Sequence, residues 1–154
     1  MEDSRRDFIK KTIAASAAVS LGGILPGFSA NSYAGISGAN ERINVAIMGV
    51  HARGLALAEN YAAQKNCEVI YVSDVDSQVM DTCIDRVEKI QKKRPKAAPD
   101  FRKALEDKSL EALVIAAPDH WHAPATILAC KAGKHVYVEK PCSHNPHEGE
   151  LMVA

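Results

Sequence analysis

The chain has 154 residues, of which 47% are hydrophobic and 25% charged, a composition typical of one soluble globular domain and not of a disordered or fibrous protein. Its 19 basic and 19 acidic residues cancel, so no overall field attracts nucleic acid or an anionic membrane. The four cysteines form no C-x-x-C pair and have no zinc-ribbon spacing, so we expect neither a metal site nor a redox motif.

The first 34 residues have the features of an export signal. The segment 4–10, Ser-Arg-Arg-Asp-Phe-Ile-Lys, resembles a twin-arginine motif, and an Ala-rich apolar stretch follows over residues 12–25. That stretch is too short and too rich in small residues for stable membrane insertion, although an uncleaved leader is the alternative. Small residues at Ser32 and Ala34 predict cleavage before Gly35. We therefore expect a periplasmic or otherwise exported protein.

Residues 35–41 read as a linker, and residues 42–154 alternate between strand and helix patterns. The apolar run 43–48 predicts a strand covered on both faces. Later strands are expected at 68–73, 112–117 and 135–138, with a weaker one at 97–99, and helices at 54–64, from Ser77 to before Pro95, at 101–105, at 123–132 and from 147 onward. The fold class is α/β, a doubly wound and mainly parallel sheet. The last helix runs to Ala154 without a cap, so we expect a truncated domain whose substrate domain is missing.

A glycine turn follows the first strand. It reads Gly49-Val50-His51-Ala52-Arg53-Gly54, which keeps the first and third glycines of the Rossmann fingerprint G-x-G-x-x-G and places His51 at the second. His51 either tilts outward and donates a hydrogen bond to a phosphate, or obstructs the dinucleotide. We favour the first interpretation, because Arg53 and the following helix N-terminus offer positive potential.

Asp74 ends the second strand, 25 positions after Gly49. This is near the spacing at which a carboxylate binds a ribose hydroxyl, so Asp74 favours NAD, while NADP remains possible if a neighbouring cation overrides the like charge. In the alternative interpretation, Asp74 or Asp76 only caps the helix that begins near Ser77.

Two further segments carry a family resemblance. The third strand ends in Ala116-Ala117-Pro118-Asp119-His120-Trp121-His122, and later come Ala132-Gly133-Lys134-His135-Val136 and Glu139-Lys140-Pro141. Together these resemble the Gfo/Idh/MocA family of glucose-fructose oxidoreductase and inositol dehydrogenase, with Asp119 where the family usually has Asn. The resemblance covers about residues 42–154.

The resemblance implies a site at the carboxyl ends of the strands. It places Lys140 beside the nicotinamide, in contact with the substrate hydroxyl, as a catalytic residue together with His122. Pro118, Asp119 and Glu139 would contribute to the cofactor site, and Glu139 would orient Lys140 or its loop. Trp121 and His122 would wall the nicotinamide pocket. Oxidising a secondary alcohol needs a proton acceptor at oxygen, and a lysine amine suits that task. The histidines of this region, with Cys142, show no ligand spacing that favours a metal.

We therefore expect an exported NAD(P)-dependent oxidoreductase acting on a sugar or cyclitol. Its partners would be a small carbohydrate substrate and, through the missing C-terminal domain, further copies of itself, with no nucleic acid; the chain alone should be inactive. One alternative is an NAD-dependent glycosidase of the same family. Another is a non-catalytic exported nucleotide- or sugar-binding protein, for which His51 is the main indication.

Overall fold

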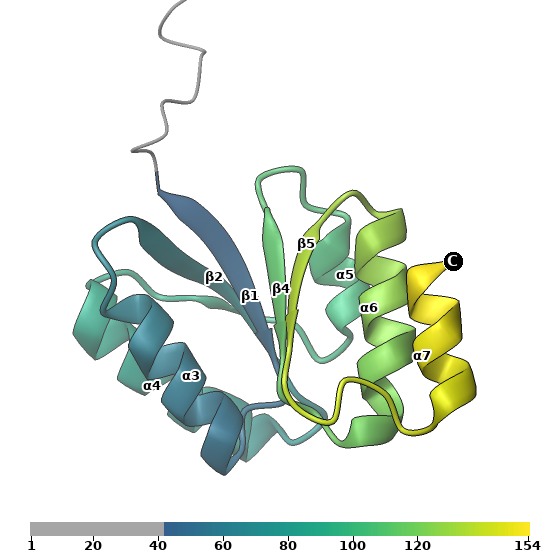
Figure 1. The fold of residues 1–154 in the computed structure, drawn as a ribbon. Coiled ribbons are helices and arrows are strands. Elements are labelled where there is room, and N and C mark those ends of the chain that lie inside the picture. The colour runs from purple at the N-terminus through teal and green to yellow at the C-terminus, as the bar shows by residue number, and fades with distance from the viewer. Residues whose placement is uncertain (1–41) are drawn as a thin grey trace, which may run out of the picture. The chain divides into compact units, whose positions relative to one another are not determined.

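The computed structural model describes residues 42–154. The expected signal segment 1–34 and the linker 35–41 lie outside the described residues. Figure 1 shows a central sheet with helices on both sides. The predicted doubly wound α/β fold is confirmed: the five strands are all parallel and follow the order β3-β2-β1-β4-β5.

The elements lie close to their predicted positions. The strands are β1 (Ile43–Met48), β2 (Cys67–Ser73), β3 (Lys96–Ala97), β4 (Ala112–Ile115) and β5 (His135–Val138). The helices are α3 (Ala52–Ala62), α4 (Ser77–Gln91), α5 (Phe101–Leu105), the 3-10 turn η1 (Asp119–Trp121), α6 (His122–Lys131) and α7 (Pro146–Val153). β4 ends two residues before the predicted limit, because the chain leaves the sheet at Ala116 to enter the loop before η1.

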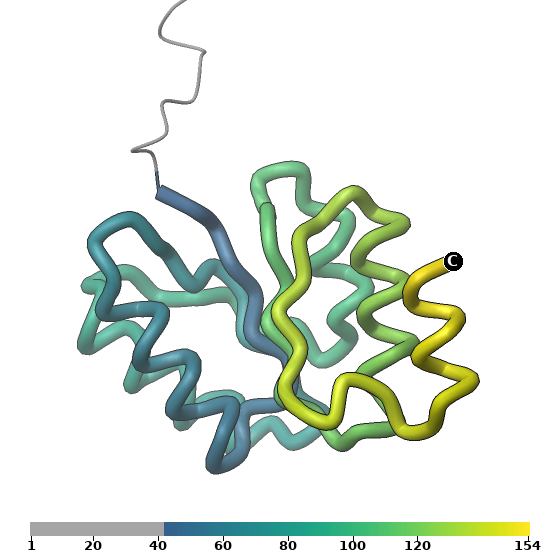
Figure 2. The backbone as a smooth tube through the Cα atoms, viewed as in Figure 1, coloured from purple at the N-terminus to yellow at the C-terminus, as the bar shows by residue number. Residues whose placement is uncertain are grey.

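The last four residues of β1, 45–48, are buried on alternate faces of the sheet, which explains why all four are apolar. Val45 and Ile47 belong to the core beneath α3 and α4, while Ala46 and Met48 belong to the core beneath α5 and α6. The smooth trace in Figure 2 follows the same two helical layers on either side of the strands. Each layer covers one face, so both sides of β1 are removed from water over residues 45–48.

Short polar side chains set where helices begin. The Asp76 carboxylate accepts hydrogen bonds from the backbone N–H groups of Gln78 and Val79, which makes Asp76 the N-cap of α4. Ser77, from which this helix was expected to run, is its first residue. Asp100 caps α5 and Asn145 caps α7 by the same kind of bond.

The outer side of β2 is completed by a side chain. β3 pairs with β2 only at Tyr71 and Val72, which leaves the beginning of β2 without a strand neighbour on that side. There the Gln91 amide oxygen accepts from the Val69 N–H at 3.0 Å, and its amide nitrogen donates to the Val69 carbonyl at 2.9 Å. The amide thus replaces the missing strand contacts.

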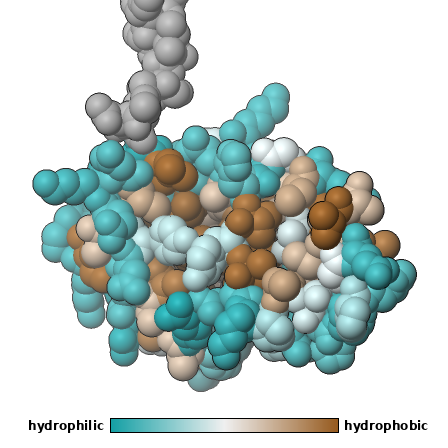
Figure 3. Space-filling model, in the orientation of Figure 1, coloured by the Kyte–Doolittle hydropathy of each residue, from teal (hydrophilic) through white to brown (hydrophobic). Residues whose placement is uncertain are grey.

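The opposite edge of the sheet is β5. Tyr137 on this strand is 43% exposed and packs edge to face against Tyr61 of α3. In the view of Figure 3, hydrophobic side chains reach the surface near the middle and hydrophilic ones surround them. Within residues 42–154, none of the helices has both the length and the apolar character that a membrane span needs.

Candidate functional site

The glycine turn after β1 has no room for side chains at its two glycines. Gly49 has φ +80°, and a Cβ added there would lie 2.5 Å from the backbone nitrogen of Ala117. A Cβ on Gly54 would lie 1.7 Å from the Gly49 carbonyl oxygen. The first glycine therefore permits the turn and its close approach to the loop after β4, and the second permits α3 to pack against the turn.

His51 is the N-cap residue of α3. It has extended backbone geometry, and its side chain makes no capping hydrogen bond to the first turn of the helix. The imidazole is exposed and is not among the residues that line either of the two cavities below. The start of α3 is therefore not closed by its own N-cap side chain.

Asp74 ties the end of β2 to the glycine turn. Its Oδ2 accepts from the Val50 N–H at 2.8 Å, and its Oδ1 accepts from the Asp76 N–H at 3.1 Å. Neither bond reaches the first turn of α4, which Asp76 caps, so the helix-cap alternative applies to Asp76 and not to Asp74. Each Asp74 oxygen keeps acceptor capacity for a ligand hydroxyl.

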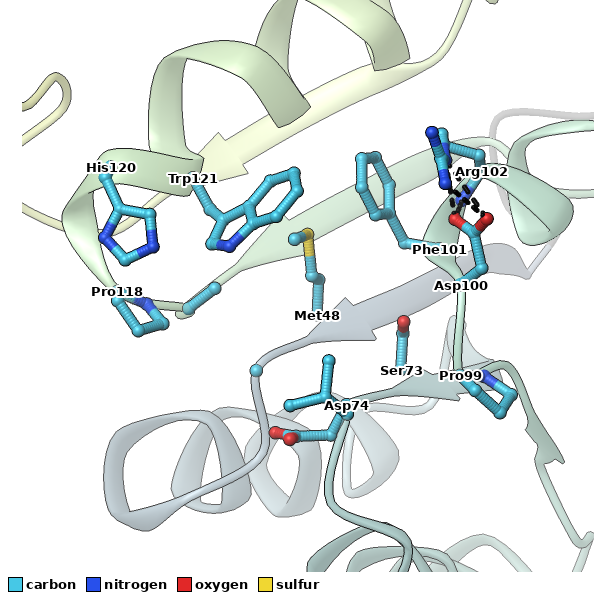
Figure 4. Close-up of a pocket in the computed structure, with 13 residues that line it drawn as sticks. Met48, Ser73, Asp74, Pro99, Asp100, Phe101, Arg102, Pro118, His120 and Trp121 are labelled. Atoms are coloured by element: carbon cyan, nitrogen blue, oxygen red, sulfur yellow. Dashed lines mark hydrogen bonds and ion pairs between the residues drawn. The ribbon is translucent and has the colours of Figure 1, made fainter.

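A cavity of about 530 Å³, here called the Asp74 cavity, opens beside this carboxylate. Figure 4 shows its residues, which come from the ends of β1 and β2, the start of α5 and the loop after β4. Phe101 and Trp121 form an aromatic wall, in edge-to-face contact with ring centroids 6.2 Å apart. The remaining lining residues are Met48, Gly49, Ser73, Asp74, Val75, Pro99, Asp100, Arg102, Ala117, Pro118 and His120.

A second cavity of about 780 Å³, here called the Lys140 cavity, lies at the ends of β4 and β5. It is lined by Arg53, Ala116, Ala117, Asp119, His122, Glu139, Lys140 and Pro141. Ala117 lines both cavities, and it is the residue whose backbone Gly49 approaches. The two hollows therefore adjoin at the glycine turn.

Arg53 and Glu139 bind each other across the Lys140 cavity. The Arg53 guanidinium lies 2.7 and 2.8 Å from Glu139 Oε1, through Nη2 and Nε, and the Tyr137 hydroxyl donates to the same oxygen at 3.1 Å. The hydrogen bond from Arg53 holds the pKa of the Glu139 carboxyl below its usual value, and the same bond raises the pKa of Arg53. The Arg53 charge that we expected to face an anion is paired with Glu139, and the described side-chain bonds of Glu139 go to Arg53 and Tyr137 rather than to Lys140.

His122 is buried, with 2% of its surface exposed, and its ring lies between two loops. Nε2 is 2.8 Å from the Ala117 carbonyl oxygen in the loop after β4, and Nδ1 contacts the Pro141 carbonyl oxygen in the loop after β5. Both ring nitrogens thus contact backbone. Through Pro141, His122 fixes the chain immediately after Lys140.

Asp119, which stands where the family usually has Asn, also connects these two loops. Its Oδ2 lies 3.2 Å from Nδ1 of His144, which follows β5. The His144 side chain holds the pKa of the Asp119 carboxyl below its usual value. No group of three or more potential metal ligands is found within residues 42–154.

The predicted site residues divide between the two cavities. Gly49, Asp74 and Pro118 line the first, Arg53, Asp119, His122, Glu139 and Lys140 line the second, and His51 and Gly54 line neither. Trp121, expected beside His122 at the nicotinamide, lies instead in the Asp74 cavity. Sequence reasoning missed the residues of the loop after β3 and the start of α5, above all Asp100 and Arg102. They follow a short strand whose carboxyl end lies on the same side of the sheet as those of β1, β2 and β4.

A model of the oxidoreductase family with an NAD-binding Rossmann fold, GFO_IDH_MocA, matches residues 43–154. A glycosyl hydrolase family 109 protein from Stenotrophomonas maltophilia is 30% identical over 141 residues, covering 88% of this chain and 29% of that protein. An alpha-N-acetylgalactosaminidase from Shewanella oneidensis is 29% identical over 107 residues, covering 66% of this chain and 23% of that protein. The chain thus spans less than a third of the length of these two curated relatives.

Solved structures share the fold. GenD2 from gentamicin A biosynthesis, in complex with NAD, is 25% identical with a TM-score of 0.67, covering 84% of this chain and 33% of that one. The myo-inositol dehydrogenase from Lactobacillus casei, in complex with NAD(H) and myo-inositol, is 20% identical with a TM-score of 0.67, covering 73% of this chain and 32% of that one.

Proposed function

The chain belongs to the Gfo/Idh/MocA oxidoreductase family, whose NAD-binding Rossmann domain it contains, and from this premise we propose that it serves an enzyme transferring hydride between nicotinamide and a hydroxyl of a sugar or cyclitol. NAD, the cofactor expected from the sequence, is the cofactor of this family's domain. The observation that carries the proposal is the junction of the two cavities at Ala117, where Gly49 has no side chain.

The residues present fit a dinucleotide lying across this junction. Gly49 and Gly54 clear the backbone where a pyrophosphate would pass, and the start of α3, without a side-chain cap, offers N–H donors to it. The exposed His51 lines neither cavity, which supports outward tilt rather than obstruction. Asp74 would accept from the adenosine ribose beside an aromatic wall suited to a flat base, and the nicotinamide would lie in the Lys140 cavity.

Lys140 is the residue we propose for proton transfer. Bound nicotinamide would supply a hydride acceptor, and the Lys140 amine in its neutral form would accept the proton of the reacting hydroxyl. Lys140 is exposed at its cavity, where a substrate can reach it. The neighbouring Glu139 carboxylate is paired with Arg53.

His122 is assigned a positioning role within this catalytic group. Because both ring nitrogens contact carbonyl oxygens, the buried imidazole is engaged with backbone on both sides. It holds the loop that carries Lys140 against the loop that carries Pro118 and Asp119. The preorganisation of Lys140 follows from this contact.

The same proposal includes the cellular setting. The twin-arginine pattern of the first 34 residues supports export in the folded state, with the dinucleotide acquired before export, and a periplasmic or otherwise exported location. The substrate would be a small carbohydrate, and further copies of the protein would associate through a C-terminal domain beyond this one. Neither nucleic acid nor stable membrane insertion is part of the proposal.

A second candidate function is an NAD-dependent glycosidase. It is favoured by the names of the curated relatives, an alpha-N-acetylgalactosaminidase and a glycosyl hydrolase family 109 protein. Such an enzyme would oxidise its sugar transiently and return the hydride, so the same NAD site would serve both reactions. Incubating the complete protein with glycosides and with free sugars separates them: free sugar without net NADH selects the glycosidase, and accumulating NADH selects the dehydrogenase.

The proposal is tested by titrating NAD calorimetrically into the complete protein and into a His51→Gly variant. We expect saturable binding by the parent. Binding only by the variant would instead favour a non-catalytic protein with a decayed site. Absence of binding by both would contradict the proposed function.

A further inference from the structure

The Asp74 cavity has one strongly cationic side chain, and that side chain is already paired. Arg102 is the only arginine or lysine among the lining residues within 42–154. Its Nε lies 2.8 Å from Asp100 Oδ1 and its Nη2 lies 2.8 Å from Asp100 Oδ2, a two-point contact seen in Figure 4. The Arg102 guanidinium is thus directed at a carboxylate from its own loop.

Asp100 is held in place for this contact by the backbone. Its Oδ1 also accepts from the Arg102 N–H at 3.0 Å, because Asp100 is the N-cap of α5. The bonds from Arg102 keep the pKa of the Asp100 carboxyl below its usual value, so the pair stays ionised at neutral pH. A planar guanidinium bound at two points has its best donor edge occupied.

The second carboxylate of the cavity, Asp74, has no such cation. Its described partners are the N–H groups of Val50 and Asp76. Because the charges of Arg102 and Asp100 cancel, the Asp74 carboxylate gives the cavity a net negative charge. A ribose hydroxyl can donate to that carboxylate, whereas a phosphate in its place would meet like charge.

Resting on the proposed function, we propose that Asp100 determines the choice of NAD over NADP, because it occupies Arg102, the only arginine or lysine that lines the Asp74 cavity within residues 42–154. Arginine binds phosphate through the same two-point contact that it makes here with Asp100. Asp100 is therefore a specificity-determining residue although it need not touch NAD. Both carboxylates would disfavour NADP. Asp74 would repel the ribose phosphate, and Asp100 would prevent Arg102 from binding that phosphate.

The test is the Asp100→Asn variant of the complete protein, with the dissociation constants of NAD and NADP measured by calorimetry. Asn keeps an oxygen for the N-cap bond, so α5 is retained while the charge that binds Arg102 is removed. We expect the ratio of the NADP dissociation constant to the NAD dissociation constant to fall at least about tenfold, because Arg102 gains a charged hydrogen bond to the phosphate. The Asp100→Asn/Arg102→Gln double variant should lose this gain.

A matched control is Asp85→Asn. Asp85 binds Arg94 at 2.8 Å, and neither residue lines the Asp74 cavity. This variant should therefore leave the ratio of the NADP and NAD dissociation constants unchanged. Thermal unfolding verifies that each variant is folded, and Asp100→Ser, which also retains a capping oxygen, replaces Asp100→Asn if that variant is not.

The outcomes separate the two proposals. A parent that binds NAD, together with a ratio unchanged in folded Asp100→Asn, overturns the role of Asp100 alone. A gain that persists in the double variant overturns the role of Arg102. A parent that binds neither dinucleotide overturns the proposed function and this inference with it.

Discussion

The carboxylate of Asp74 accepts a hydrogen bond from the backbone N–H of Val50 at 2.8 Å. This bond joins the end of β2 to the turn that follows β1. It holds the carboxylate and the glycine turn together at the carboxyl ends of these two strands. A single side chain thus helps to shape the nucleotide site and is also proposed to bind the ribose.

The two roles of Asp74 can be separated by substitution. Asp74→Asn keeps an oxygen for the Val50 N–H, whereas Asp74→Ala removes the acceptor. We expect Asp74→Ala to lower the free energy of unfolding by about 1 to 3 kcal/mol, because a backbone donor loses its partner, and Asp74→Asn to lower it by less. Both should weaken NAD binding, measured by calorimetry. Equal stability of the two variants would contradict the structural role of the Val50 bond.

The clash at Gly54 predicts a large loss from one methyl group. In Gly54→Ala the new Cβ meets the Gly49 carbonyl oxygen at 1.7 Å, so the turn and α3 must separate. Gly133→Ala is the comparison: Gly133 has positive φ (+72°), which Gly54 does not, and nothing lies within 4 Å of its added Cβ. We expect Gly133→Ala to lower the free energy of unfolding by about 1 to 2 kcal/mol, from backbone strain alone. Gly54→Ala should lower it by more, as measured by chemical denaturation. A loss for Gly54→Ala no larger than that for Gly133→Ala would contradict a severe clash with the Gly49 carbonyl oxygen.

Lys140 is expected to affect turnover more than cofactor binding. In Lys140→Gln the proton acceptor is lost, so kcat should fall by about 10²- to 10⁴-fold with the Kd for NAD little changed. Lys131→Gln, on the exposed end of α6, serves as the control and should retain full activity. A Lys140→Gln enzyme with undiminished kcat would exclude Lys140 as the acceptor.

The loop before β4 should make the free energy of unfolding depend on pH in the acid range. Hydrogen bonds from Ser109, and then from the Tyr71 hydroxyl, lower the pKa of Asp107 from 3.8 to about 2. The ionised form is favoured in the folded state, so its stabilisation is complete above pH 3.8 and is lost as the pH falls through about 2. Unfolding midpoints measured from pH 5 to about 2 should therefore fall more steeply for the parent than for Asp107→Asn. Parallel curves would contradict this assignment.

The fold could be predicted from the sequence because its pattern is local. The apolar run of β1 and the helical spacing in α4 each identify an element without reference to the rest of the chain. The glycine turn was found in the same way, since the spacing of Gly49 and Gly54 follows from backbone geometry.

Side-chain partners were harder to predict because they depend on contacts between segments far apart in the chain. Nothing in the local sequence indicates that Arg53 pairs with Glu139, 86 positions away. The position of Trp121 was misjudged for a related reason. It is adjacent in sequence to His122, but neighbouring residues of a helical segment project in different directions, so the two side chains line different cavities.

The most direct test of the account is a crystal structure of the complete protein with NAD. We predict one dinucleotide across the glycine turn, with its adenosine ribose at Asp74 and its nicotinamide in the cavity that holds Lys140 and His122. A dinucleotide bound elsewhere, or one whose nicotinamide lies on the Asp74 side, would contradict the account.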